Sequence, residues 1–175
     1  MRVSVFVGTS LDGFIARENG CLDFLEMASD EDNGYEAFLE SVDAVVLGRK
    51  TYETVSAYHQ WPYVEKLVVV LSTTLRGARG PEGSRCEFIN GSPAEVLSRL
   101  AQRGTQHVYV DGGGTIQRFL REGLVHDITI NRGPVLIGAG VPLFGSLFRD
   151  VRLQHVRTRT FPSGFVQSEY RVISG

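Results

Sequence analysis

Three short runs of apolar residues, each followed by a segment rich in glycine, hydroxyl or basic residues, constrain the fold of this chain most strongly. The runs are AVVL, LVVVL and VYV, at 44–47, 67–71 and 108–110. Continuous apolar runs of this length are typical of strands that are buried on both faces. Because helix-like segments separate them, they predict a mainly parallel sheet with helical crossovers, and therefore an α/β fold.

The flanking segments extend this sheet. Further strands are expected at 2–7, 86–90 and 125–131, and helices at 30–40, 49–55, 92–104 and 116–120. The helix after Ser92 has the clearest start, because Ser92 can cap it, Pro93 suits its first position and Glu95 completes a capping box. Two strand patterns at 151–161 and 165–173 flank the turn PSG and predict a C-terminal antiparallel hairpin.

Length and charge narrow the class of protein. A chain of 175 residues is the size of one domain, and we expect a single domain over 1–175. The net charge of -2 gives no basic surface of the kind that nucleic-acid binders carry. Without a run of 18 apolar residues or a secretory leader, we expect a cytoplasmic protein with no membrane partner. The two cysteines fit no metal-binding spacing, so no metal is expected.

The carboxyl ends of the three apolar strands carry groups suited to anions. The first is followed by Gly48, Arg49, Lys50 and Thr51, the second by Ser72, and the third by Asp111, three glycines and Thr115. Ligands of open α/β sheets bind beyond these strand ends. Helices that start there also present free N–H groups and the positive end of the helix dipole.

The triplet Gly112, Gly113 and Gly114 has two readings. Glycines permit a positive φ and the close approach of a phosphate, but they also permit close packing of a helix on a strand. Likewise, the GRKT segment is either an anion site or a solvated basic first turn. A basic pair at a helix start opposes the dipole, which favours a bound anion. Two such sites at one sheet edge point to a ligand such as NADPH.

The order of five motifs resembles a known superfamily. SLDGFIA, AVVLGRKTYE, LVVVLS, VYVDGGGTI and GPVLIGAGVPLF are similar to the dihydrofolate reductase-like superfamily, in the branch of the C-terminal reductase domain of bifunctional riboflavin biosynthesis enzymes. The resemblance implies a three-layer fold. Its central sheet would be mixed and mostly parallel, with about eight strands and helices on both faces. It also implies NADPH as cofactor and a homodimer.

The resemblance also implies roles for individual residues. Gly48 to Thr51 match the helix start that holds the adenosine phosphates, with Arg49, Lys50 and Ser72 near the 2′-phosphate. The pyrophosphate loop corresponds to Gly112, Gly113, Gly114, Thr115 and Ile116. The strand and mobile loop beside the nicotinamide correspond to Gly8, Ile15 and Ala16.

The substrate side is less defined. The riboflavin-type reductases carry a lysine in the first strand, whereas this stretch reads VSVFVGT, which weakens the expectation of a phosphoribosyl-pyrimidine substrate. Asp32 matches the position of the acidic residue that binds the pterin in folate reductases, and we consider it as proton source. Its neighbours Asp30, Glu31 and Glu36 are alternatives, and any of them can be a solvated helix start. Trp61 either stacks on a flat substrate or covers the core beneath a loop.

These observations predict an NADPH-dependent oxidoreductase. The expected reaction is hydride transfer to a small heterocycle, either pterin-like or ribosylaminopyrimidine-like, as in dihydrofolate reductase or 5-amino-6-(5-phosphoribosylamino)uracil reductase. The alternative is a non-catalytic protein that binds NADP(H) or a flavin on the same fold. The two hypotheses share the phosphate residues and differ in the pocket beside the nicotinamide, where only an enzyme needs room and a polar group.

Overall fold

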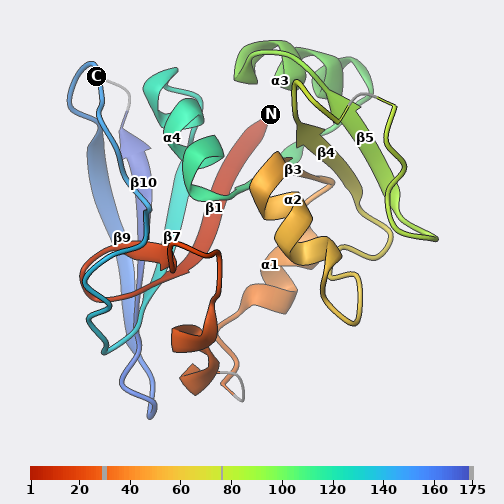
Figure 1. The fold of residues 1–175 in the computed structure, drawn as a ribbon. Coiled ribbons are helices and arrows are strands. Elements are labelled where there is room, and N and C mark those ends of the chain that lie inside the picture. Colours follow the sequence, from red (N-terminus) through yellow and green to blue (C-terminus); the bar gives the residue numbers. More distant parts are fainter. Residues whose placement is uncertain (29–30, 76, 174–175) are drawn as a thin grey trace.

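The computed structural model describes residues 1–28, 31–75 and 77–173, and in it a central sheet lies between two layers of helices (Figure 1). The eight strands follow the order β5-β4-β3-β6-β1-β7-β10-β9. They are β1 (Arg2–Thr9), β3 (Ala44–Gly48), β4 (Leu67–Leu71), β5 (Arg85–Ile89), β6 (His107–Asp111), β7 (Asp127–Arg132), β9 (Arg152–Thr160) and β10 (Val166–Ile173). All pairs from β5 to β7 are parallel, and β10 is antiparallel to β7 and β9. The predicted mixed, mostly parallel sheet with a C-terminal hairpin is confirmed.

The helices cover both faces of the sheet. They are α1 (Tyr35–Ser41), α2 (Arg49–Ser56), α3 (Pro93–Gln102) and α4 (Gly113–Arg121), together with a 3-10 helix, Asp23–Ala28. Apolar side chains of α3 and α4 pack in one core cluster, and those of α1 and α2 pack in the other. Strand β3 serves both clusters, since Val46 lies in the first and Val45 in the second, which is why its sequence is apolar without alternation.

Two local predictions have different outcomes. The capping box of α3 is present, with Ser92 accepting from the Glu95 N–H and Glu95 accepting from the Ser92 N–H. The helix expected at 30–40 instead begins at Tyr35. The side chains of Asp32 and Asn33 accept the N–H groups of Gly34 and Tyr35, and Gly34 has a φ of 81°, so this segment forms turns that compete with a helix.

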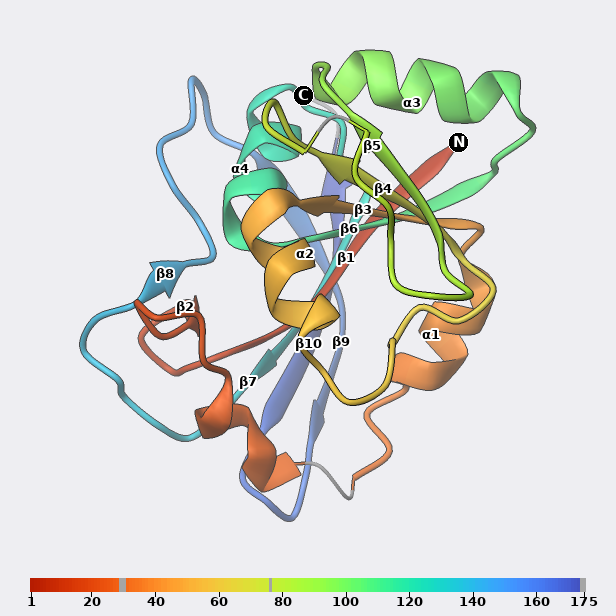
Figure 2. The same cartoon turned by 45° about the vertical axis from the view of Figure 1, so that its right-hand side comes forward.

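A small second sheet lies beside the first. Strand β2 (Phe14–Ala16) pairs with β8 (Val141–Pro142), which joins the segment after β1 to the segment after β7 (Figure 2). Neither strand was predicted, because they have only three and two residues, which is too short for a recognisable strand pattern. In the described parts of the chain, no helix has the length and apolar character needed to cross a bilayer.

Candidate functional site

The largest cavity lies between the starts of α2 and α4, beyond the carboxyl ends of β3 and β6. Its volume is about 960 Å³. The two helices lie next to each other (Figure 2), and neither has a side-chain cap on its first turn. Their free N–H groups therefore favour an anionic ligand. Ten residues predicted for the cofactor line this cavity: Ile15, Ala16, Gly48, Arg49, Lys50, Thr51 and Gly112–Thr115.

Gly48 and Gly112 allow the two helix starts to interlock. A Cβ added at Gly48 would lie 2.6 Å from the Thr115 Oγ1, and one added at Gly112 would lie 2.1 Å from the Thr51 Oγ1. Each glycine thus makes room for the threonine of the opposite helix. Gly112 also has a φ of 92°, which L side chains rarely adopt.

The other two glycines of the triplet differ from each other. A Cβ on Gly113 would meet the Pro142 carbonyl oxygen at 2.9 Å, so Gly113 serves the packing of α4 against β8. A Cβ on Gly114 would meet nothing within 4 Å, although Gly114 lines the cavity. The packing reading therefore applies to the first two glycines, and the third faces open space in the large cavity.

A basic recess of about 230 Å³ adjoins this cavity. Ser72, Arg49 and Arg118 line it, and both arginines also line the larger cavity. The Ser72 hydroxyl accepts the N–H groups of Thr74 and Leu75, which fixes the turn after β4. Lys50 lies in the larger cavity and not in this recess. Sequence reasoning missed Arg118, whose signal is its position one helical turn after Thr115.

A second cavity of about 620 Å³ shares part of its wall with the large cavity. Its walls combine apolar and acidic side chains: Phe6, Leu22, Leu25, Phe161 and Phe165 with Glu31, Asp32, Glu36 and Asp111. Ile15, Leu22, Tyr35 and Asp111 line both this cavity and the large one. The two spaces therefore adjoin at these residues.

Asp111 lies at this junction, and sequence reasoning did not assign it a role. Its Oδ1 accepts the Gly112 N–H at 2.7 Å, and its Oδ2 is 3.4 Å from the Tyr63 hydroxyl. Desolvation raises the pKa of the Asp111 carboxyl and outweighs these hydrogen bonds, which lower it. Burial also raises the pKa of the Tyr35 and Tyr63 hydroxyls, so both remain protonated and able to donate. The site thus holds a carboxyl that retains its proton more readily than an ordinary aspartate.

The position of Asp32 does not suit the proton donor that the sequence predicted. Asp32 lines the second cavity, but it is exposed and its Oδ1 accepts the Gly34 N–H, so it lacks the burial that tunes a proton donor. Its alternatives Glu31 and Glu36 also line this cavity, and Asp30 lies outside the described residues.

Trp61 lines neither cavity. It packs against Tyr52 and Tyr63 and donates to the Tyr63 carbonyl at 3.1 Å, so it covers the core beneath a loop. These contacts favour the reading in which Trp61 covers the core.

Besides Ser72 in the recess, two predicted cofactor residues lie outside the large cavity. Gly8 lines the second cavity instead, where a Cβ would meet the Leu25 side chain at 2.8 Å. The Ile116 side chain is fully buried in the core, and its N–H donates to the Gly112 carbonyl at 2.8 Å. Ile116 therefore anchors α4 and has no free polar group for a ligand.

Comparison with known proteins supports the same class of fold. The family model of the RibD C-terminal domain matches residues 2–167. The uncharacterized protein YwjB of Bacillus subtilis is 33% identical over 163 residues, with 90% of each chain covered. A putative riboflavin biosynthesis protein from Shewanella sp. PV-4 is 36% identical, with a TM-score of 0.91 over 99% of this chain and 100% of the other. Dihydrofolate reductase from Enterococcus faecalis, solved with NADP(H), shares the fold at 14% identity, with a TM-score of 0.68 over 99% of this chain and 97% of the other.

Proposed function

We propose, from the premise that this chain belongs to the RibD C-terminal domain family, that it is an NADPH-dependent reductase of a small, flat heterocycle. The observation that carries the proposal is the meeting of two cavities at Asp111 and Ile15. One cavity has the helix starts and basic groups that suit a dinucleotide, and the other has the apolar walls that suit a ring. Hydride transfer requires this contact between two bound molecules.

The residues of the large cavity fit the cofactor. The uncapped starts of α2 and α4 suit the pyrophosphate, and the space at Gly114 admits it. The recess between Arg49 and Arg118 suits the 2′-phosphate that distinguishes NADPH from NADH. When bound, the reduced nicotinamide supplies the hydride, and the protein orients the partners and excludes water.

Asp111 is the group best placed to supply the accompanying proton. Its Oδ1 is held by the Gly112 N–H, which leaves Oδ2, beside the Tyr63 hydroxyl, to carry the proton. A carboxyl with a raised pKa is partly protonated nearer neutral pH, where it acts as a general acid. In this proposal Asp111 takes the part that sequence reasoning gave to Asp32.

A titration with NADPH and NADH tests the proposal. A ligand that binds only the folded state at 100 times its Kd raises the free energy of unfolding by about 2.7 kcal/mol, so thermal stability reports binding. We expect Arg118→Gln to weaken NADPH roughly ten-fold or more, since it removes a charge-assisted contact, and to change NADH little.

Arg121→Gln is the matched control, because Arg121 lies on the same helix but outside both cavities and the recess. Equal loss of NADPH and NADH binding in Arg118→Gln would remove the 2′-phosphate assignment. If the wild-type protein bound neither nucleotide, the reductase proposal would fall. If it bound NADPH but turned over no pterin or ribosylated pyrimidine, the non-catalytic alternative would be favoured.

A further inference from the structure

A row of paired residues crosses the sheet from the second cavity to the outermost strand, β9. Gly8 on β1 pairs with Asn131 on β7, Asn131 with Gln167 on β10, and Gln167 with Arg159 on β9. Paired residues of neighbouring strands point to the same face of a sheet, so the four lie in line. Gly8 and Asn131 line the cavity, and Arg159 lies on the outermost strand.

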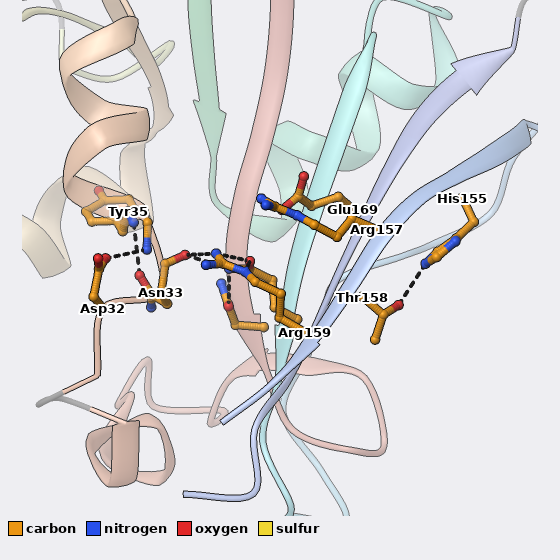
Figure 3. A network of polar contacts seen from close by, with 11 residues as sticks. Asp32, Asn33, Tyr35, His155, Arg157, Thr158, Arg159 and Glu169 are labelled. Carbon is orange, nitrogen blue, oxygen red and sulfur yellow. Dashed lines mark hydrogen bonds and ion pairs between the residues drawn. The ribbon is translucent and has the colours of Figure 1, made fainter. Parts of the chain in front are cut away.

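Hydrogen bonds connect the polar members of this row. The Arg159 Nε donates to the Gln167 Oε1 at 2.9 Å, and its Nη2 donates to the same oxygen and, at 2.8 Å, to the Asn33 carbonyl. The Gln167 Nε2 donates to the Asn33 carbonyl and to the Asn131 Oδ1, both at 2.7 Å. Figure 3 shows Arg159 reaching from β9 to Asn33, on the loop before α1.

Arg159 fixes the direction of every bond in this row. A guanidinium has donors and no acceptor, so the Gln167 atom that faces it must be the amide oxygen. The Gln167 NH₂ group then points to the Asn33 carbonyl, which can only accept, and to Asn131. The Gln167 NH₂ group needs an acceptor, so Asn131 must turn its Oδ1 toward Gln167. The Nδ2 of Asn131 then points away from Gln167.

The Asn131 NH₂ group is consequently left for a ligand. Asn131 is 5% exposed and lines the second cavity, and its Nδ2 has no hydrogen-bond partner among residues 1–28, 31–75 and 77–173. Among the described residues the buried side-chain polar atom without a partner is the Ser56 Oγ, so the Asn131 Nδ2 is open to the cavity, where an acceptor on a bound molecule can reach it.

The other walls of the cavity exclude one kind of substrate. In the described part of the chain, four carboxyl groups and no lysine or arginine line it: Glu31, Asp32, Glu36 and Asp111. Recognition of a phosphate requires basic groups or free helix N–H groups, and here carboxylates would repel it. The cavity therefore suits a molecule without a phosphate group.

We propose that Asn131 determines substrate specificity by donating from Nδ2 to a ring carbonyl oxygen of an unphosphorylated heterocycle. Arg159 and Gln167 are positioning residues that set the direction of the Asn131 amide. This inference rests on the proposed function, because it takes the second cavity as the substrate site. The inference narrows the substrate to lactam-type rings, whose carbonyl oxygen accepts from the Asn131 Nδ2. It disfavours rings that carry an amino group in place of this oxygen.

Two pteridines that differ at one ring position test the inference. Pterin has an oxo group where 2,4-diaminopteridine has an amino group, and both are measured by their own fluorescence at a pH where both are neutral. The titrations use the full chain, with and without saturating NADPH. We expect the wild-type protein to bind pterin roughly ten-fold or more tightly than the diamino probe, and Asn131→Leu to bring this ratio close to one.

Variants at the sheet edge separate positioning from folding. Arg159→Met removes one of the two groups that orient the Gln167 amide, the other being the Asn33 carbonyl, and should reduce the ratio in part. Arg159→Lys keeps a donor without acceptors at this position and should retain the ratio. Arg157→Met is the matched control, because Arg157 lies on the same strand and bonds Glu169, not Gln167 (Figure 3). It should leave the ratio unchanged.

The outcomes distinguish this inference from the proposed function. A wild-type ratio near or below one, a ratio that Asn131→Leu and Arg159→Met leave unchanged, or no binding of either pteridine would overturn the inference. NADPH binding measured in the same titrations would still support the reductase proposal in each case. Conversely, an Asn131-dependent preference for pterin in a protein that does not bind NADPH would uphold the inference and overturn the reductase.

Discussion

Replacement of Gly112 by alanine tests the interlock of the two helix starts. With a φ of 92° and a ψ of 129°, Gly112 occupies a backbone region that costs other residues about 1–3 kcal/mol. The new methyl would also lie 2.1 Å from the Thr51 Oγ1 and 3.2 Å from its Cβ. Overpacking of this kind typically costs a further 1–3 kcal/mol. We therefore expect Gly112→Ala to lower the free energy of unfolding by about 2–6 kcal/mol.

Gly114→Ala is the matched comparison two residues away. Its methyl would meet nothing within 4 Å, and Gly114 lies in the first turn of α4, where alanine stabilises a helix by up to about 1 kcal/mol relative to glycine. The methyl would occupy space in the cofactor cavity, however. We expect Gly114→Ala to keep or raise stability and to weaken NADPH binding, whereas Gly112→Ala primarily lowers stability.

Thermal and urea unfolding measure the first effect, and NADPH titration measures the second. For a chain of this size, 1 kcal/mol shifts Tm by about 2–4 °C, so Gly112→Ala should lower Tm by at least about 4 °C. Adding Thr51→Ala should recover the overpacking part and leave the backbone strain. A Gly112→Ala protein with wild-type Tm, or a Gly114→Ala protein with wild-type NADPH affinity, would refute the division of roles among the glycines.

Three further changes have outcomes set by the structure. Burial raises the pKa of the Asp111 carboxyl in the folded state above its ordinary value of 3.8, so the folded protein holds this proton more tightly than the unfolded chain. The contribution of Asp111 to the free energy of unfolding is therefore complete below pH 3.8 and is lost as the pH rises through the raised pKa. Asp111→Asn should remove this dependence in urea unfolding measured across pH and should slow turnover; an unchanged pH profile would contradict the burial of this carboxyl. Ser92→Ala should lower the free energy of unfolding, measured by urea, by about 1 kcal/mol, because it removes a capping bond of α3; an unchanged free energy would contradict the capping box. Trp61→Phe should cost about 1 kcal/mol through its lost bond to the Tyr63 carbonyl and leave substrate KM unchanged; a large KM increase would restore the stacking role.

The central strands could be predicted because the pattern that identifies each of them lies within a few consecutive residues. Strands β3, β4 and β6 are buried on both faces, so each carries an apolar run that no surface segment would need. The start of α3 was predictable for the same reason, since its capping groups lie within four residues. Most residues predicted to bind the cofactor lie around one cavity, because the order of strands brings the carboxyl ends of β3 and β6 to one edge.

The substrate side could not be predicted in the same way. The second cavity collects residues far apart in the sequence, such as Phe6, Asp111 and Asn131, through pairings that no local pattern encodes. The role of Asp111 depends on desolvation, which is a property of its surroundings and not of its residue type. The start of α1 was misplaced because Asp32 and Asn33 favour both helix starts and turns, and here their side chains close turns.

Several local costs lie at the edge where β3 and β6 end. The helices α2 and α4 begin there without side-chain caps, and Arg49 lies at a helix start whose dipole disfavours a positive charge. Single costs of this kind also occur elsewhere, since α1 begins without a side-chain cap and Glu65 has a φ of 65°. At the ends of β3 and β6, however, two uncapped helix starts and a cation line the same large cavity. A phosphate-bearing ligand would bond the free N–H groups and pair with Arg49, whose guanidinium otherwise contacts Glu53, so binding offsets these costs. Their position around one cavity is therefore an argument that this edge is a binding site.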